Sequence, residues 1–478
     1  MGRGSPILLS VTSVSFLLSL IVWCSAFSII VSGADGLGNP FHNALPSCQI
    51  RRLRDLAIDL CSRFGLGKRK TKVALWIDTL CIPVAPELKE YRKLAIGLLA
   101  RTYTEAMGVL VLDRELCRFE SSEASVLELG IRVMCSGWLK RLWTLQEASL
   151  AGNAEGTGTL YIQMADGPAH WNRLTRCFEY KPSRPRPPSR KPSPLAVSVQ
   201  EAKTDLVYGM HLLVAMEDRL PSVRDIQEPR FETRFQKIMS AVQNRSTSKR
   251  EDEPICTASL LGLDLRQILD AKDVDERMMK FYRLLHEIPT AIIFAEFGVP
   301  GSLSRNLTTA PYRWAPRSLS LLERPMEINL ALSAMRFTDP PLPLLGSCED
   351  DGLHIQHPGF VFDDTGPTFI ARESILLDTS DGELHSLSLA LSNNQPQMIG
   401  PVERCALIFK TDICSDVLIV TIESEMALVA GVRFYVAIIG HGTVKPRSAS
   451  ELSEGDGSAG LQPLRGFSTK RGQQWRVT

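Results

Sequence analysis

The chain has 478 residues, and its 54 Lys and Arg against 53 Asp and Glu leave a formal net charge of +1. Because the positive and negative charges are almost equal in number, the chain has no overall field that would draw it to nucleic acid or to an anionic membrane. With 44% hydrophobic and 22% charged residues the composition is that of a folded protein of two or three domains. The 11 cysteines form no C-x-x-C pair, which fits a reducing compartment better than a disulfide framework.

The N-terminus opens with a long apolar segment, because residues 6–32 carry no charge. This run is long enough for a membrane span, and Cys24-Ser25-Ala26 could end a cleaved signal peptide. Alternatively, Phe27 to Val31 forms a buried parallel strand beside Val73 to Asp78, and residues 1–26 are a loosely attached apolar helix. The last interpretation predicts a cytoplasmic protein, whereas the first two predict a membrane-bound or secreted one.

A strand, a helix and a second strand are predicted next. Val73 to Asp78 is an apolar run closed by a carboxylate, and Gly108 to Asp113 repeats this pattern. Between them, one helical face is formed by Leu88, Tyr91, Ala95, Leu98, Leu99, Thr102 and Ala106. A parallel pair with a right-handed crossover would put Asp78 and Asp113 on the carboxyl edge of one sheet, where ligands bind in open α/β folds. Equally, both aspartates could simply end their strands or cap the loops beyond.

The segment from Trp138 to Glu147 predicts a helix that belongs mostly to the core. Leu139, Leu142, Trp143 and Gln146 share one face, so Trp143 should be largely buried. An inward glutamine or glutamate needs polar partners, and Arg141 or the strand-end aspartates can supply them. Two interpretations follow. Either a polar cluster lies at the sheet edge, formed by Asp78, Asp113, Arg141 and Gln146, or Arg141, Gln146 and Glu147 form a hydrogen-bonded brace that only stabilises the fold.

The rest of the chain divides by composition. Residues 181–194 hold six prolines and five basic residues among fourteen, which is typical of an extended linker. Helical patterns follow, and alternating apolar patterns replace them further along. The predicted organisation is an apolar segment 1–26, an α/β domain 27–178, a linker 179–200, a helical region 201–320, a β-rich region 321–443 and a disordered tail 444–478.

No motif identifies a reaction. The G-x-G-x-x-G, Walker A and G-x-S-x-G patterns are absent, so neither a nucleotide loop nor a nucleophile elbow is predicted. No zinc spacing is present, and His354 and His357 near Cys348 lie in a loop-like stretch, so no metal is predicted. The catalytic residues therefore stay unknown at this point.

Several of these segments resemble the heterokaryon-incompatibility (HET) domain of filamentous fungi. The stretch from Trp76 to Pro83 is similar to the W-I-D-x-x-C-I/V strand end of that family, and the stretch from Trp138 to Glu147 to its R-x-W-T-x-Q-E segment. The stretch from Arg245 to Leu263 is similar to a downstream segment of the family. The first strand of the family usually ends in Ser-His/Tyr-x-Trp, whereas Ser32-Gly33-Ala34 stands here. The matching motif residues are Trp76, Ile77, Asp78, Cys81, Trp138, Arg141, Trp143, Gln146 and Glu147.

This resemblance implies that the α/β domain is a TIR-like or flavodoxin-like parallel sheet domain, and the sequence pattern predicts a helical region and a β-rich region after it. It implies a cytosolic protein of fungal non-self recognition that triggers programmed cell death by self-association or through protein partners, with no cofactor and no nucleic acid. The second hypothesis is enzymatic, since TIR-related domains cleave NAD at the nicotinamide bond. Glu147 or Glu87 would then be the carboxylate that stabilises the ribosyl cation.

Overall fold

The computed structural model divides into two compact units. The N-terminal unit comprises Met1–Asp270 with Asn329–Arg336, and the C-terminal unit comprises Ala271–Ile328 with Phe337–Thr478. The structure describes residues 28–33, 43–63, 74–122, 124, 126–151, 160–171, 220, 223–294, 306–320, 345–363, 369–370, 375–378, 384–389, 398–399, 404–410, 416–428, 431–446, 464–469 and 472–478. The apolar segment 1–26 and the linker 179–200 lie outside these residues.

The N-terminal unit is built on a five-stranded sheet in the order β2-β1-β3-β4-β5. Its strands are β1 (Ser28–Gly33), β2 (Ala74–Trp76), β3 (Gly108–Leu112), β4 (Leu160–Met164) and β5 (Gly167–His170). The predicted strand at Phe27 to Val31 corresponds to β1, which pairs in parallel with both β2 and β3, so its predicted place beside the Val73 strand is confirmed. β3 and β4 also pair in parallel, whereas β4 and β5 form an antiparallel hairpin.

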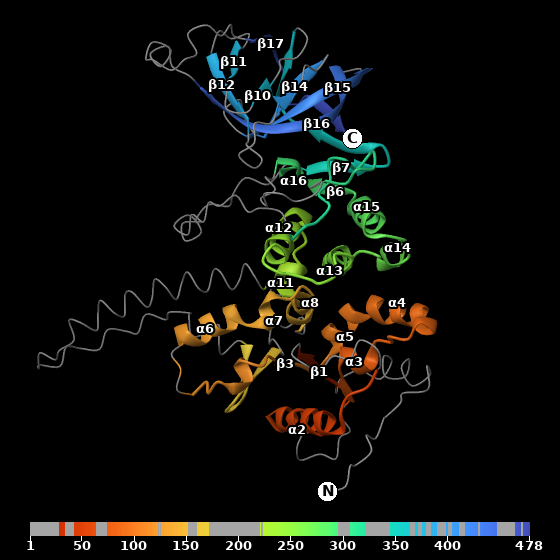
Figure 1. Cartoon of the computed structure of the whole chain (residues 1–478), viewed down its shortest axis with the longest axis vertical. Helices are drawn as coiled ribbons and strands as arrows, with labels where there is room; N and C mark the ends of the chain where they lie inside the picture. Colours follow the sequence, from red (N-terminus) through yellow and green to blue (C-terminus); the bar gives the residue numbers. More distant parts are fainter. Residues whose placement is uncertain are drawn as a thin grey trace, which may run out of the picture. The chain divides into compact units, whose positions relative to one another are not determined.

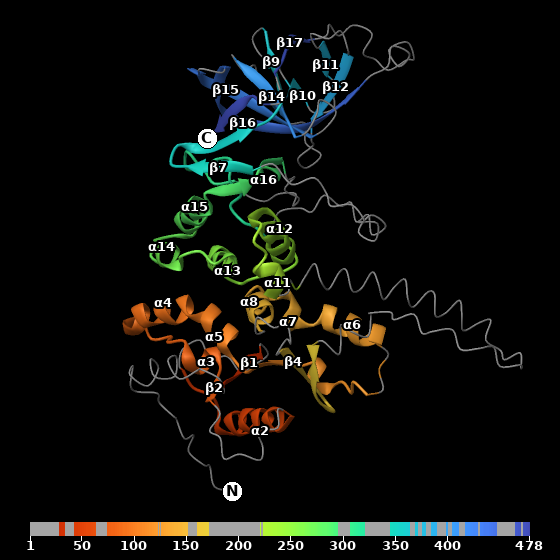
Figure 2. The ribbon, with the colours of Figure 1, turned by 180° about the vertical axis from the view of Figure 1, so that it is seen from behind.

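Helices cover both faces of this sheet (Figure 1). One face carries α2 (Ser47–Arg63), whose Leu53 and Leu60 form a core with Ile77 and Leu110. The opposite face carries α4 (Lys89–Gly97), α5 (Leu99–Glu105), α6 (Val126–Cys135), α7 (Gly137–Lys140) and α8 (Trp143–Leu150) (Figures 1 and 2). There Val109 and Val111 of β3 meet the second core. A strand that is buried on both faces explains why β3 reads as an unbroken apolar run.

The predicted helix after Pro86 is divided into three pieces. A short 3-10 turn at Pro86–Leu88 leads into α4, and Leu98 separates α4 from α5. Tyr91, which the helical pattern placed on the inner face, is 41% exposed, so that part of the prediction is wrong. Tyr103, which the pattern left out, is buried, because the break at Leu98 changes which residues of α5 face the core.

Helices from further along the chain complete the N-terminal unit. They are α11 (Val223–Ile226), α12 (Phe231–Val242), α13 (Asp252–Leu261) and α14 (Leu265–Leu269). α13 is buried along almost its whole length and packs against α8. It ends at Gly262, whose φ of 74° lies in the left-handed region that glycine adopts without strain.

The C-terminal unit is dominated by a closed barrel of seven strands. The ring runs β12-β11-β17-β9-β14-β15-β16, and the antiparallel pairing of β12 with β16 closes it. Its strands are β9 (Gly359–Phe362), β11 (Ile375–Asp378), β12 (Leu384–Leu389), β14 (Cys405–Phe409), β15 (Asp416–Leu428), β16 (Gly431–Pro446) and β17 (Leu464–Ser468). Inside it, aromatic and aliphatic side chains such as Phe360, Leu407 and Val417 form one buried cluster.

Further strands extend the barrel beyond β16. They are β18 (Gln474–Val477), β8 (Gly352–Gln356), β7 (Leu345–Glu349) and β6 (Glu287–Pro289), in that order. The helices α15 (Val274–Leu285) and α16 (Ala291–Phe294) belong to the same unit, and β10 (Phe369–Ile370) pairs separately with β13 (Met398–Ile399).

The predicted fold class, a TIR-like or flavodoxin-like parallel sheet domain followed by helical and β-rich regions, is wrong. The largest sheet of the described chain closes into a barrel, and the N-terminal sheet ends in an antiparallel hairpin instead of continuing in parallel. Barrel closure joins β12 to β16, which are far apart along the chain, and an alternating apolar pattern shows that strands exist but not which strands pair.

The predicted disordered tail, residues 444–478, is also corrected in part. β16 continues to Pro446, and the tail contains β17 and β18. β17 is a member of the barrel, and Trp475 and Val477 of β18 are fully buried. The polar, glycine-rich composition concealed these strands because they are short and their apolar residues alternate with polar ones.

Two structural observations concern the cysteines and the apolar helices. The described cysteines, Cys48, Cys61, Cys81, Cys117, Cys135, Cys256, Cys348 and Cys405, are all free thiols. Within the described residues, no helix combines the length and the apolar character that crossing a bilayer requires.

Candidate functional site

The clearest chemical feature of the N-terminal unit is the carboxyl group of Glu147 on α8. Glu147 is partly buried, and its carboxyl accepts hydrogen bonds from the Trp138 indole and the Tyr103 hydroxyl. Loss of solvent raises the pKa of this carboxyl to about 7, and the like charge of Asp78 acts in the same direction. A group with this pKa can gain and lose a proton at neutral pH, as general acid–base chemistry requires.

Two arginines partly offset the burial of Glu147. The charges of Arg141, which follows α7, and of Arg245, which follows α12, both lower the pKa of the Glu147 carboxyl. These charges come from separate segments of the chain, as does that of Asp78 at the start of α3 (Asp78–Cys81). The fold therefore brings one negative and two positive side chains close enough to Glu147 to change its ionisation.

Asp113 fixes the backbone that carries Trp138. It follows β3 directly and is 1% exposed, and both of its carboxylate oxygens accept hydrogen bonds from backbone N–H groups. Oδ1 bonds the N–H groups of Glu115 and Leu116 at 3.0 and 3.2 Å, and Oδ2 bonds that of Trp138 at 3.0 Å. The strand-end aspartate Asp113 thus joins the loop after β3 to the start of α7. It is linked to Glu147 indirectly, because it fixes the backbone of Trp138.

A segment from later in the chain holds α7 and α8 in place. The N–H of Ser246 donates to the Lys140 carbonyl at 2.7 Å, and the N–H of Leu142 donates to the Ser246 carbonyl at 2.9 Å. The buried Arg245 guanidinium donates to the Arg141 carbonyl and to the Thr144 hydroxyl at 2.8 and 2.9 Å. This strand-like attachment fixes the turn between the helix of Trp138 and the helix of Glu147.

Two residues of α8 bind α13 directly. The indole N–H of Trp143 donates to Asp252 Oδ2 at 2.7 Å, and Nε2 of Gln146 donates to the Ser259 hydroxyl at 2.5 Å. Gln146 is 1% exposed, as predicted for an inward polar side chain. Trp143 is intermediate in exposure and packs against the core cluster that contains Leu139, in agreement with its predicted place on the inner face of the helix.

The sequence-predicted site residues do not all meet. Asp78 and Arg141 act on Glu147, whereas Gln146 bonds α13 and Asp113 bonds backbone N–H groups. Asp78 is exposed, and its Oδ1 accepts the N–H of Thr79 at 2.6 Å. Glu87 is exposed on the 3-10 turn before α4 and is not among the charges that shift the Glu147 pKa most.

The other motif residues serve the two cores. Trp76 is buried, and its ring lies edge-on to that of Tyr103 with centroids 5.8 Å apart. Cys81 packs partly buried against the same core, and Ile77 is buried in the core on the α2 face.

Tyr103 and Arg245 are functional candidates that the sequence did not single out for the site. Arg245 had a signal, because it begins the downstream segment that resembles the HET family. Tyr103 had none, because a tyrosine within an amphipathic helix looks the same whether its hydroxyl meets water or a carboxyl.

One group in the C-terminal unit has the side chains of a metal site. Nε2 of His354 lies 2.8 Å from Asp351 and 3.8 Å from Glu349. The Arg476 guanidinium, however, lies 3.2 Å from Asp351, and its positive charge would oppose a bound cation. His357 takes no part, since it bonds the Phe409 carbonyl and the Thr290 hydroxyl. We interpret the cluster as an ion-pair network.

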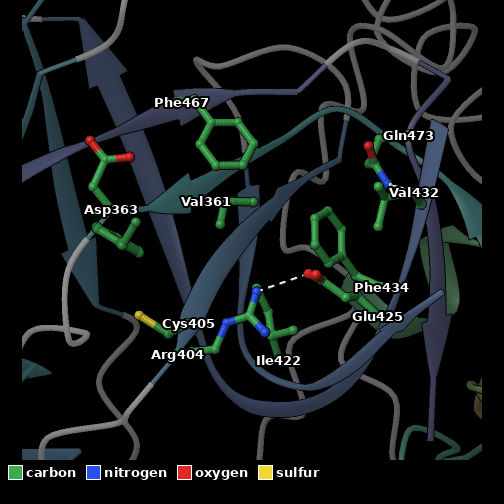
Figure 3. A pocket seen from close by; sticks show the side chains of 11 residues that line it. Val361, Asp363, Arg404, Cys405, Ile422, Glu425, Val432, Phe434, Phe467 and Gln473 are labelled. Carbon is green, nitrogen blue, oxygen red and sulfur yellow. Dashed lines mark hydrogen bonds and ion pairs between the residues drawn. The ribbon is translucent and has the colours of Figure 1, made fainter. Parts of the chain in front are cut away.

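The barrel carries a surface cavity of about 620 Å³ (Figure 3). Its wall is largely apolar, with Phe434 and Phe467 among the lining residues. The charges of Arg404 and Glu425 pair with each other at 3.0 Å, and burial raises the pKa of the Cys405 thiol to about 12. The lining therefore contains no activated nucleophile, and Glu147 remains the stronger chemical candidate.

No protein-family model matches the chain, and neither a curated protein nor a solved structure does.

Proposed function

We propose that this protein acts in fungal non-self recognition as a HET-type inducer of programmed cell death that works by self-association, with the N-terminal unit as its effector. One observation carries the proposal. Motif residues that are separated along the chain, including Asp78, Trp138 and Arg141, act together on the carboxyl of Glu147. A motif that served packing alone would not need to surround one ionisable group with charges of both signs.

A viability assay tests this function. The full chain is expressed from an inducible promoter in a filamentous fungus, and surviving cells are counted. The wild type and Glu87→Gln should kill the cells, whereas Glu147→Gln should not, although it is the same chemical change. Purified wild type should also form oligomers in light scattering. Survival of wild-type cells at full expression, or equal killing by Glu147→Gln, would contradict the proposal.

A second candidate function is cleavage of NAD at its nicotinamide bond. It is favoured by the pKa of Glu147, because a partly buried carboxylate can stabilise the positive charge that develops on a ribosyl group as its bond breaks. Asp78 adds negative charge nearby, which would stabilise the same cation. NAD is then a substrate, and the cation it forms is captured by water.

Nicotinamide release measures this activity directly. The full chain incubated with NAD should release nicotinamide, and Glu147→Gln should reduce the rate by about 100-fold or more, as expected for loss of a catalytic carboxylate. Glu87→Gln should retain the wild-type rate, because Glu87 is exposed and is not among the charges that shift the Glu147 pKa most. No release by wild type would exclude NAD cleavage while leaving the proposed signalling role open.

A further inference from the structure

The Glu147 carboxyl is bonded by two donors whose own positions are fixed by the core. We propose that Tyr103 is a positioning residue for Glu147, and that its hydroxyl and the Trp138 indole together hold the carboxyl in one orientation and favour its ionised form. This inference rests on the role proposed above for Glu147. It adds a residue outside the motifs that resemble the HET family.

Packing keeps the Tyr103 hydroxyl in place. Tyr103 is 3% exposed, and its ring meets that of Trp76 at an angle of 73°. The pKa of its hydroxyl is raised well above the usual value, chiefly by burial and also by the charges of Glu147 and Asp78, so the hydroxyl stays protonated and acts as a donor. Its helix, α5, also packs directly against α8.

The second donor is equally constrained. Trp138 is fully buried, and its backbone N–H is bonded to Asp113. The turn it belongs to is capped by Ser136, whose hydroxyl accepts the N–H of Leu139 at 3.2 Å. Neither donor can follow a moving carboxyl, so Glu147 must stay where both can reach it.

The remaining charged and titratable groups around Glu147 separate into three kinds. Asp78 disfavours its ionised form, and Arg141 and Arg245 favour it. Cys256 on α13 stays neutral, because burial raises the pKa of its thiol to about 12. Removing the Tyr103 hydroxyl leaves all four groups in place, so Tyr103→Phe isolates the effect of one hydrogen bond.

The pH dependence of stability reports this bond without any assay of function. Because the pKa of Glu147 rises from 4.5 to about 7 on folding, the folded protein is stabilised below pH 4.5 and loses that contribution as pH rises to 7. In Tyr103→Phe the ionised carboxyl loses a hydrogen-bond donor, so the Glu147 pKa in the folded protein should rise. The decline in the free energy of unfolding with pH should therefore continue to a pH about one unit higher than in wild type. Urea unfolding of the full chain at a series of pH values measures both profiles.

Tyr282→Phe is the matched control. Tyr282 is fully buried, and its hydroxyl donates to the Pro316 carbonyl at 2.9 Å, so Tyr282→Phe removes a buried hydrogen bond to a backbone carbonyl. Its profile should run parallel to that of wild type. Glu147→Gln should remove the decline, and adding Tyr103→Phe to Glu147→Gln should not restore it.

A Tyr103→Phe profile parallel to wild type across the pH range would overturn the inference and leave Tyr103 with a purely structural role. If Tyr103→Phe does not fold, 3-fluorotyrosine placed at position 103 provides the test. Its hydroxyl is a stronger donor, so the decline should end at a lower pH than in wild type, and an unchanged end point would also overturn the inference. Because the readout is unfolding, absence of NAD cleavage or of cell death would not affect the result.

Discussion

At the residue scale, the ionisation of Glu147 depends on side chains from distant parts of the chain. Its burial in α8 raises the pKa, and Asp78 raises it further, while Arg141 and Arg245 lower it. These opposing charges leave the carboxyl with a pKa of about 7 instead of a fully neutral or fully ionised group. The balance can therefore be shifted in either direction by a single charge change.

Asp78→Asn and Arg141→Gln should shift this balance in opposite directions. Asp78→Asn removes a repelling charge and lowers the Glu147 pKa. The free energy of unfolding should therefore fall less between pH 5 and pH 8 in this variant than it does in wild type. Arg141→Gln removes an attracting charge and should show the reverse. Each difference should be about 1 kcal/mol or less in urea unfolding, since Asp78 is exposed and solvent screens it. Shifts of the same sign would contradict the assigned charges.

Asp113→Ala should be strongly destabilising. It removes the acceptor of the N–H groups of Glu115, Leu116 and Trp138, two of which are buried, and should lower the free energy of unfolding by about 2–4 kcal/mol. Asp264→Ala is the control, because Asp264 accepts the N–H of Arg266 at an exposed helix start and should cost about 1 kcal/mol or less. Equal costs in urea unfolding would show that burial of the Asp113 bonds does not matter.

At the element scale, α8 is held from both sides by hydrogen bonds that its own sequence does not determine. Its start is fixed by the Arg245 segment, and its face is fixed by α13 through Trp143 and Gln146. Such a short helix has little intrinsic stability in water, so tertiary contacts must supply it. The orientation of Glu147 therefore depends on residues about a hundred positions downstream.

The bond between Trp143 and Asp252 can be measured by a double-mutant cycle. Trp143→Phe and Asp252→Ala should each destabilise the protein, and the double variant should cost less than the sum. The coupling should be about 1–2 kcal/mol, as expected for a hydrogen bond to a charged acceptor at 2.7 Å. Strictly additive costs in urea unfolding would mean that this bond contributes nothing to the attachment of α8 to α13.

At the scale of the whole molecule, the two largest sheets of the described chain are built differently. The N-terminal sheet brings β1, β2, β3 and β4 together in parallel, and the C-terminal sheet closes on itself. Closure leaves no unpaired edge in the ring, which removes a surface open to aggregation. β17, a strand of residues near the C-terminus, completes the ring between β9 and β11.

Gly466→Ala tests the place of β17 in the barrel. A Cβ at Gly466 would meet the Val361 carbonyl and, at 2.6 Å, ring atoms of Phe360, so the substitution should cost about 1–3 kcal/mol of overpacking. Gly472→Ala is the control, because nothing lies within 4 Å of its Cβ and its cost should be small. Unfolding in urea compares the two, and equal stabilities would show that β17 does not pack against β9 in this way.

The sequence by itself determined the local elements of the protein. Apolar runs located β1, β2 and β3, and polar residues in apolar surroundings singled out Asp78, Asp113, Arg141 and Gln146. These inferences are possible because side-chain periodicity reflects local backbone geometry.

Only the tertiary structure decided which strands pair and which side chains meet. The closing pair β12–β16, the strands β17 and β18, and the contact of Tyr103 with Glu147 all join residues that are distant along the chain. The pKa of Glu147 also depends on the tertiary structure, since burial and charges from other segments of the chain set it. A sequence pattern records how each segment folds locally, but distances between segments are set by packing, and both barrel closure and proton affinity depend on those distances.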